Sequence, residues 1–287
     1  FLALLISPFA LAQQVPDTRF DTRVARPAFS GRALRVLFDE AHHNFHTTTG
    51  RYLVFARLVR NDGAVITPNA TAFTTATLSH HDLLVIANAL GSDDMSDSSA
   101  RRPAFTTDEC GAVHDWVAAG GALLLIADHA PMGDAARALA ERFGVDMRGA
   151  YTIDPEQGAA GNPTLITFVA GHGLATTHPI VAGRDSSETV RKVVAFTGQS
   201  LSGPPGAVSL LTLSARAEDL LTGYGPADLT HVPAERRRAA GGRSMGLAFG
   251  LGKGRVVVLG EAAMLSAQRA GMFGKPMGMN VPGSDDR

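Results

Sequence analysis

The chain has 287 residues, of which 45% are hydrophobic, 18% charged and 6% aromatic, and this composition excludes an intrinsically disordered protein. The formal net charge is −1, from 26 Lys and Arg against 27 Asp and Glu, so the chain is not a globally basic binder of nucleic acid. Cys110 is the only cysteine, which excludes an intramolecular disulfide and a cysteine-rich zinc site.

The first twelve residues, FLALLISPFALA, have the apolar run and small-residue ending of a secretory signal peptide, here a remnant without its charged start. We expect cleavage before Gln13 and a periplasmic or secreted protein. A short buried helix is the alternative, which Pro8 disfavours. No later segment approaches the ~18 to 20 apolar residues of a membrane-spanning helix. Residues 13–32 indicate an extended lead-in, and we expect 33–287 to form a single α/β domain.

Short apolar runs alternate with helical patterns in the first half of the chain. The runs ALRVLF (33–38), AVITP (64–68), DLLVIAN (82–88) and ALLLIA (122–127) predict strands. The helical patterns cover residues 49–61, residues 106–119 and a segment that ends at Phe143. In the first of these helices, one face carries Tyr52, Phe55, Ala56 and Val59. This alternation predicts right-handed βαβ units and a mainly parallel sheet.

The second half of the chain is less regular. Strand-like pieces lie between residues 149 and 240, separated by polar loops. Two apolar runs within 244–259 flank the glycine-rich stretch GLGKG, which predicts a hairpin rather than a phosphate-binding loop. Beyond Glu261 we expect loops, with no further packing element.

Polar side chains follow three of the predicted strands. They are Asp39, Glu40, His42, His43 and His46 after the first strand, Asp128 and His129 after the central strand, and Glu261 after the late strand. The carboxyl ends of parallel strands share one edge, where ligands bind in open α/β sheets. If the three strands are neighbours, we expect His43 and His129 to face one pocket near Glu261.

This pattern suggests roles for the residues. We predict catalytic roles for Asp128, His129, Glu261 and His43, and ligand-binding roles for Asp39, Glu40, His42 and His46. Histidine and carboxylate could activate water directly, or could hold a divalent metal such as zinc, with His43, His129 and Glu261 as ligands. The alternative is that His42 and His43 make turn hydrogen bonds and that Asp128 caps the following helix. A nucleophilic Ser200 is disfavoured, because GQSLSG departs from the serine-hydrolase elbow and no helix follows it.

Four segments, in order between about residues 33 and 265, resemble the class I glutamine amidotransferase-like superfamily. They are VLFDEAHHNFH, GGALLLIADHAPMGDAA, THPIVAGR and GKGRVVVLGEAAMLS. The nearest branch is the non-amidotransferase one, with ThuA-like proteins and exported proteins related to the GIFT domain of intraflagellar transport. The resemblance implies a three-layer α/β sandwich with a mainly parallel, flavodoxin-like sheet and a polar pocket at its edge.

One departure from the superfamily bears on activity. Amidotransferases carry a nucleophilic cysteine in a Gly-x-Cys-x-Gly turn, where this chain has Asp128, His129 and Ala130, so we expect no glutaminase chemistry. The leading hypothesis is an exported hydrolase-like enzyme that acts on a carbohydrate or ester substrate. The alternative is a non-catalytic module that binds a carbohydrate, another small ligand or a protein. A structural envelope protein is a third class, which needs no pocket.

Overall fold

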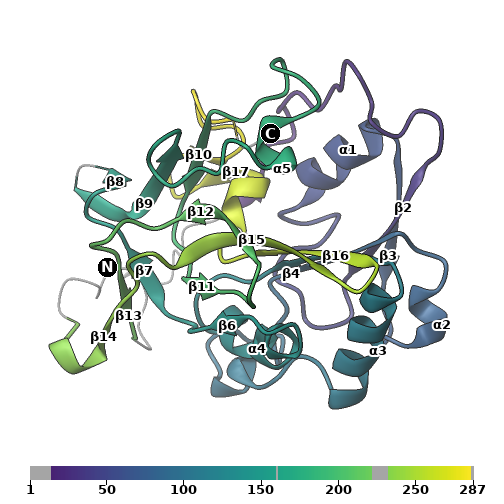
Figure 1. Cartoon of the computed structure of the whole chain (residues 1–287), viewed down its shortest axis with the longest axis horizontal. Coiled ribbons are helices and arrows are strands. Elements are labelled where there is room, and N and C mark those ends of the chain that lie inside the picture. The colour runs from purple at the N-terminus through teal and green to yellow at the C-terminus, as the bar shows by residue number, and fades with distance from the viewer. Residues whose placement is uncertain (1–13, 160, 222–231, 286–287) are drawn as a thin grey trace, which may run out of the picture.

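The computed structural model describes residues 14–159, 161–221 and 232–285, so the predicted signal peptide and its cleavage site lie outside the described residues. Within these ranges, a central sheet holds nine strands (Figure 1). Their spatial order is β3 (Ala64–Asn69), β2 (Leu34–Asp39), β4 (Leu83–Ala87), β5 (Ala122–Ile126), β16 (Gly254–Leu259), β15 (Ser244–Leu251), β11 (Leu201–Ser202) and β6 (Asp146–Met147), with β12 (Val208–Thr212) also paired to β15.

The strands from β3 to β16 are parallel to their neighbours, and the pairs from β16 to β6 are antiparallel. The chain therefore has a mixed α/β fold built on a large, mostly parallel sheet. The adjacency of the first and central strands assumed for the shared pocket is wrong, because β4 lies between β2 and β5. In the register of the sheet, Val36 of β2 pairs with Leu83 of β4, and Leu83 in turn pairs with Ala122 of β5. The central and late strands, β5 and β16, are neighbours.

Helices lie on both faces of the sheet (Figure 1). They are α1 (Leu53–Asn61), α2 (Thr75–Leu78), α3 (Thr107–Ala118), α4 (Met132–Arg142) and α5 (Pro179–Ala182), with 3-10 turns η1 (Ser98–Arg101), η3 (Ala234–Arg236) and η4 (Ala263–Leu265). Alternate residues of a strand point to opposite faces. Phe38 therefore packs with Tyr52 beside α1, whereas Leu37 joins the core under α3 and α4. None of the described helices is long and apolar enough to cross a bilayer.

The second half of the chain adds three small sheets. Their strands are β1 (Val15–Pro16), β17 (Ala267–Ala270) and β18 (Lys275–Gly278); β8 (Gly158–Ala159), β9 (Asn162–Val169) and β10 (Lys192–Ala195); and β7 (Tyr151–Ile153), β13 (Glu218–Leu220) and β14 (Arg237–Ala239). The first of them corrects the expectation of loops beyond Glu261. There β17 pairs with β1 from the lead-in, and Asp17 forms an ion pair with Arg269 at 2.8 Å.

The glycine-rich stretch GLGKG forms the predicted hairpin turn between β15 and β16. Lys253 donates its backbone N–H to the carbonyl of Ala118 at 2.9 Å, so the turn packs on the carboxyl end of α3. Gly252 has φ +57°, and a Cβ on Gly254 would collide with the carbonyl oxygen of Val117. Glycine is needed here for close backbone approach and not for phosphate binding.

The turn after β2 is held to α3 by the buried imidazole of His42. Its Nδ1 lies 2.8 Å from Oδ1 of Asp39, and its Nε2 lies 2.9 Å from Oε1 of Glu109. Phe73 and Phe105 flank the ring, with centroids at 4.8 and 4.7 Å. Both ring nitrogens therefore face carboxylates in an apolar setting, which favours the imidazolium. His42 ties the end of β2 to the start of α3.

The pKa values of His42 and Glu109 are both shifted by this arrangement. Burial lowers the pKa of His42, but hydrogen bonds and charge from Asp39 and Glu109 outweigh it and raise that pKa above its usual 6.5. Burial also opposes ionisation of Glu109, yet hydrogen bonds from Thr106, His42 and the Phe73 N–H lower its pKa from 4.5 to about 2. The stability from His42 is complete below pH 6.5 and declines as pH rises through its raised pKa. The stability from Glu109 is present above pH 4.5 and declines as pH falls toward 2.

We therefore expect His42→Leu to lower the free energy of unfolding by about 3 kcal/mol near pH 6, because both carboxylates stay buried without their partner. The difference in free energy of unfolding between the variant and wild type should narrow as pH rises through the raised pKa of His42. Urea unfolding of both proteins between pH 5 and 9 measures it.

The matched control is His114→Leu, because His114 also contacts a carboxylate, but one whose side chain is 80% exposed, on Asp115. That variant should change the free energy of unfolding by less than about 0.5 kcal/mol at every pH. Equal losses in the two variants would contradict the role given to His42.

Candidate functional site

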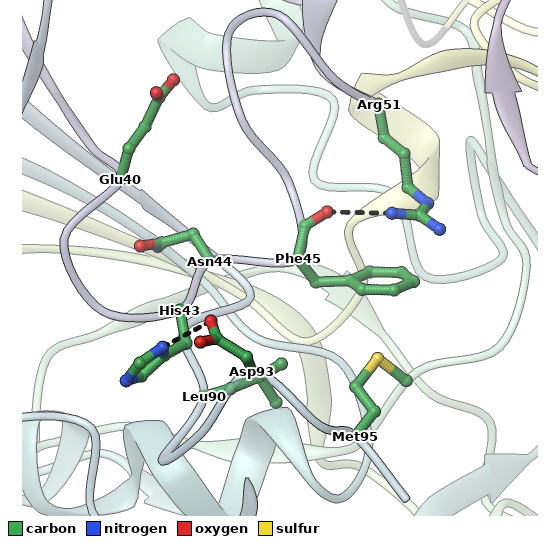
Figure 2. A pocket seen from close by; sticks show the side chains of 8 residues that line it. All are labelled: Glu40, His43, Asn44, Phe45, Arg51, Leu90, Asp93 and Met95. Atoms are coloured by element: carbon green, nitrogen blue, oxygen red, sulfur yellow. Dashed lines mark hydrogen bonds and ion pairs between the residues drawn. The ribbon is translucent and has the colours of Figure 1, made fainter.

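An open pocket of about 440 Å³ lies beyond the carboxyl ends of β2 and β4 (Figure 2). Its lining comes from the two loops that follow these strands: Glu40, His43, Asn44, Phe45, Arg51, Leu90, Asp93 and Met95. The volume falls in the range of roughly 300 to 1,000 Å³ that small-molecule sites occupy. The pocket lies at the sheet edge where the sequence pattern indicated a ligand site.

At one end of the pocket, His43 pairs with Asp93. The His43 Nδ1 lies 2.6 Å from Oδ1 of Asp93, and Figure 2 shows the other ring nitrogen turned away from that carboxylate. His43 has φ +49°, a left-handed backbone conformation that is uncommon outside glycine. The side chains of His43 and Asp93 are 43% and 90% exposed, so the pair is open to solvent and to a ligand.

Another part of the pocket carries the cation Arg51. Its guanidinium carbon lies 3.6 Å from the centroid of the Phe45 ring, and its Nη1 donates to the Phe45 carbonyl at 3.2 Å. Burial lowers the pKa of Arg51. Glu40 stands apart from it in Figure 2, and the Glu40 Oε1 accepts from the backbone N–H and the hydroxyl of Thr48, both at 2.7 Å.

Behind the pocket, the side chain of Asn88 joins three strand ends. Its Oδ1 accepts the backbone N–H of Asp128 at 2.9 Å, and its Nδ2 donates to Oδ2 of Asp128 at 2.7 Å. The same Nδ2 lies 3.1 Å from Nδ1 of His46, and the Asn88 carbonyl accepts the N–H of Phe45 at 2.9 Å. The loop that forms one wall of the pocket is thus hydrogen-bonded to β4 and β5.

This amide also sets the tautomer of His46. Because the Asn88 Nδ2 can only donate, the His46 Nδ1 accepts and the proton of the neutral ring lies on Nε2. Burial, with the nearby charge of Arg51, lowers the pKa of His46 to about 3, so the ring is neutral at physiological pH. Within the described residues, His46 Nε2 has no hydrogen-bond partner.

Three of the predicted catalytic residues make contacts of their own. Asp128 accepts the N–H of Ala262 at 2.9 Å on Oδ1; burial raises the pKa of Asp128, against the charge of His129 and these hydrogen bonds. His129 stacks on Tyr151 with ring centroids 3.9 Å apart. Glu261 is 1% exposed.

The carboxylate of Glu261 accepts the N–H groups of Ala263 and Met264 at 2.7 and 2.8 Å, at the start of η4. Of the three residues expected to share one pocket, His43 lines this pocket, and His129 and Glu261 are not among its lining residues. His129 is held by stacking on Tyr151, and Glu261 is held by the backbone amides of Ala263 and Met264. In the described part of the chain, no three His, Cys, Asp or Glu side chains are placed to hold a metal ion, so the proposed zinc ligands are not assembled.

The residues predicted to bind ligand divide in the same way. Glu40 lines the pocket, whereas Asp39, His42 and His46 are buried behind it. Ser200, which the sequence disfavours as a nucleophile, is also buried. Its hydroxyl donates to Asp219 at 2.6 Å and accepts from Arg243 at 2.6 Å.

Sequence reasoning missed Asn88, Arg51 and Asp93. Asn88 is the last residue of the predicted strand 82–88 and directly follows the observed β4, so a polar residue at the end of this apolar run was a usable signal. Arg51 fell inside the predicted helix, which begins only at Leu53. Asp93 lies outside the predicted strands and helices, and only the folded chain places it beside His43.

No family model matches the chain, and no curated protein matches it. Solved structures do resemble it. The mmIFT52 N-terminal domain is 18% identical, with a TM-score of 0.55, and the match covers 80% of this chain and 88% of that chain. At this identity the likeness shows a shared fold alone.

Two further neighbours are more distant. A protein described as ThuA-like from Bacteroides uniformis is 13% identical, with a TM-score of 0.43, and the match covers 83% of this chain and 84% of that chain. A protein from Thermoplasma acidophilum, described as part of a GMP synthase, is 13% identical, with a TM-score of 0.37, and the match covers 80% and 84%.

Proposed function

We propose that this protein binds a small polyhydroxylated ligand, of the carbohydrate class, in the pocket beyond β2 and β4. The observation that carries the proposal is the pocket lining. Glu40 and Asp93 supply carboxylates that can accept hydrogen bonds from sugar hydroxyls. The side-chain amide of Asn44 forms part of the wall, where it is hydrogen-bonded to Asp39 and to the backbone N–H of His42. Leu90 and Met95 supply apolar surface for the C–H faces of a sugar ring.

On this proposal the chain is an exported protein of the non-amidotransferase branch of the class I glutamine amidotransferase-like superfamily, with the three-layer arrangement of that fold. The FLALLISPFALA segment supports export. The fold shared with the mmIFT52 N-terminal domain is consistent with the branch. The absence of cysteine from the turn at Asp128, His129 and Ala130 supports a role other than glutaminase.

Hydrolysis of a bound carbohydrate or ester is the second candidate, and the pair of His43 and Asp93 favours it. The bond to Asp93 orients the imidazole, so that the His43 Nε2 can accept a proton from water as the water oxygen attacks the substrate. The proton then passes to the leaving oxygen. Binding ranks first, because a pair as exposed as this one gains little from its charge interaction.

Filling the pocket tests the binding proposal. We expect Met95→Trp to reduce sugar affinity at least tenfold, because the indole occupies space that the ligand needs. Isothermal titration with a panel of mono- and disaccharides measures it. Met272→Trp is the matched control, because Met272 is 89% exposed and does not line the pocket. A sugar that binds wild type and Met95→Trp equally would place the site elsewhere, and a panel without any binder would refute the proposal.

The hydrolase candidate is tested by turnover of chromogenic esters and glycosides. If His43 is the general base, His43→Ala should lower kcat by roughly 10²- to 10⁴-fold. His114→Ala, on α3 and outside the pocket lining, should leave turnover unchanged. Activity that survives His43→Ala removes His43 from the chemistry, and activity that a chelator abolishes contradicts a mechanism based on His43 and Asp93 alone.

A further inference from the structure

We infer that the ligand of this pocket carries a carboxylate or a comparable anion, which pairs with Arg51. The inference rests on the proposed function and narrows it from sugars in general to acidic sugars. Arg51 lines the pocket. Among the described residues, no carboxylate oxygen lies within ion-pair distance, 4.0 Å, of its guanidinium nitrogens.

Arg51 is held in place but is not satisfied. Its guanidinium stacks on Phe45, and in the described chain its one hydrogen bond is to the Phe45 carbonyl. Its Nε is buried and has no partner within the same residues. Burying a cation without an anion costs free energy, which a bound carboxylate recovers through charge and paired N–H donors. The planar fork is already oriented by Phe45, so little side-chain entropy is lost on binding.

Other partly buried arginines differ from Arg51 in this respect. Arg148 has Asp219 at 2.9 Å, and Arg243 has Asp146 at 2.8 Å. At both of these partly buried positions, a carboxylate of the same chain pairs with the guanidinium. At Arg51 it does not, and Arg51 is the one of the three that faces a pocket.

The helix that follows adds to the positive potential. α1 begins at Leu53, its first turn holds no acidic residue, and Tyr52 at its N-cap makes no side-chain capping bond. Neither the first turn nor the N-cap side chain therefore neutralises the positive end of the helix dipole. Figure 2 shows Glu40 and Asp93 away from Arg51. A cation in one part of the pocket and hydroxyl-binding groups in another match a polyhydroxy acid such as a hexuronate.

The test compares acidic and neutral sugars of the same ring. Glucuronate and galacturonate are titrated against glucose and galactose by isothermal titration calorimetry at low salt. We expect the uronates to bind at least tenfold more tightly than the neutral sugars, with the preference reduced by added NaCl. In Arg51→Met the preference should disappear, and in Arg51→Lys it should be intermediate, because the charge remains and the fork does not. Urea unfolding confirms that each variant is folded.

Arg57→Met is the matched control, because it removes the same charge from an exposed position of α1 that does not line the pocket. Arg57→Met should keep the full preference for uronates over neutral sugars. Neutral sugars that bind as tightly as uronates, or a preference that survives Arg51→Met, overturn the inference and leave the binding function standing. If neither class of sugar binds wild type, the proposed function itself fails.

Discussion

The side-chain amide of Asn88 is the interaction on which the ligand edge depends. It lies where β4 ends, with φ +52°, and its two polar atoms hold the backbone and the carboxylate of Asp128. The same Nδ2 also donates to His46, and the backbone carbonyl of Asn88 accepts the N–H of Phe45. The amide links the loop after β2 to the end of β5, and backbone bonds from Phe45 to Asn88 and from Leu90 to His42 join the same loop to the end of β4. The positions of Phe45 and Arg51 in the pocket follow from that attachment.

Polar groups at the carboxyl edge of this sheet serve two different purposes. His42, Asp39 and Glu261 are buried, and each bonds to a protein partner that it would be costly to remove. Glu40 and His43 face the pocket, although each also holds a protein partner. The residue types are alike in both groups, and burial decides the difference. A buried carboxylate needs permanent donors, whereas a solvated one can exchange water for a ligand.

This division explains why we propose binding rather than the catalytic scheme first expected. A catalytic triad or metal centre needs several of these groups at one point. The protein distributes them instead: His129 lies on Tyr151, Glu261 on the backbone of η4, and His43 in the open pocket. Among the described residues, the pocket-lining Arg51 has no carboxylate in ion-pair distance, and its buried Nε has no hydrogen-bond partner, which is the basis for proposing an anionic ligand.

The sequence by itself determined much of the local structure. Apolar runs and glycine-rich turns predicted β2, β4, β5 and the hairpin of β15 and β16, because strand and turn signals depend on neighbouring residues. It also placed polar residues at the sheet edge, since the ends of parallel strands must meet there. The pairing of β17 with β1 escaped prediction, because the two partners are far apart in sequence.

Only the tertiary structure decided which polar groups meet. His42 lies between Asp39 and Glu109, and the second carboxylate comes from a distant helix. The insertion of β4 between β2 and β5 separated residues that the strand pattern had brought together. Whether a polar side chain is buried, paired or open to a ligand depends on long-range contacts, and residue type and spacing do not encode them locally.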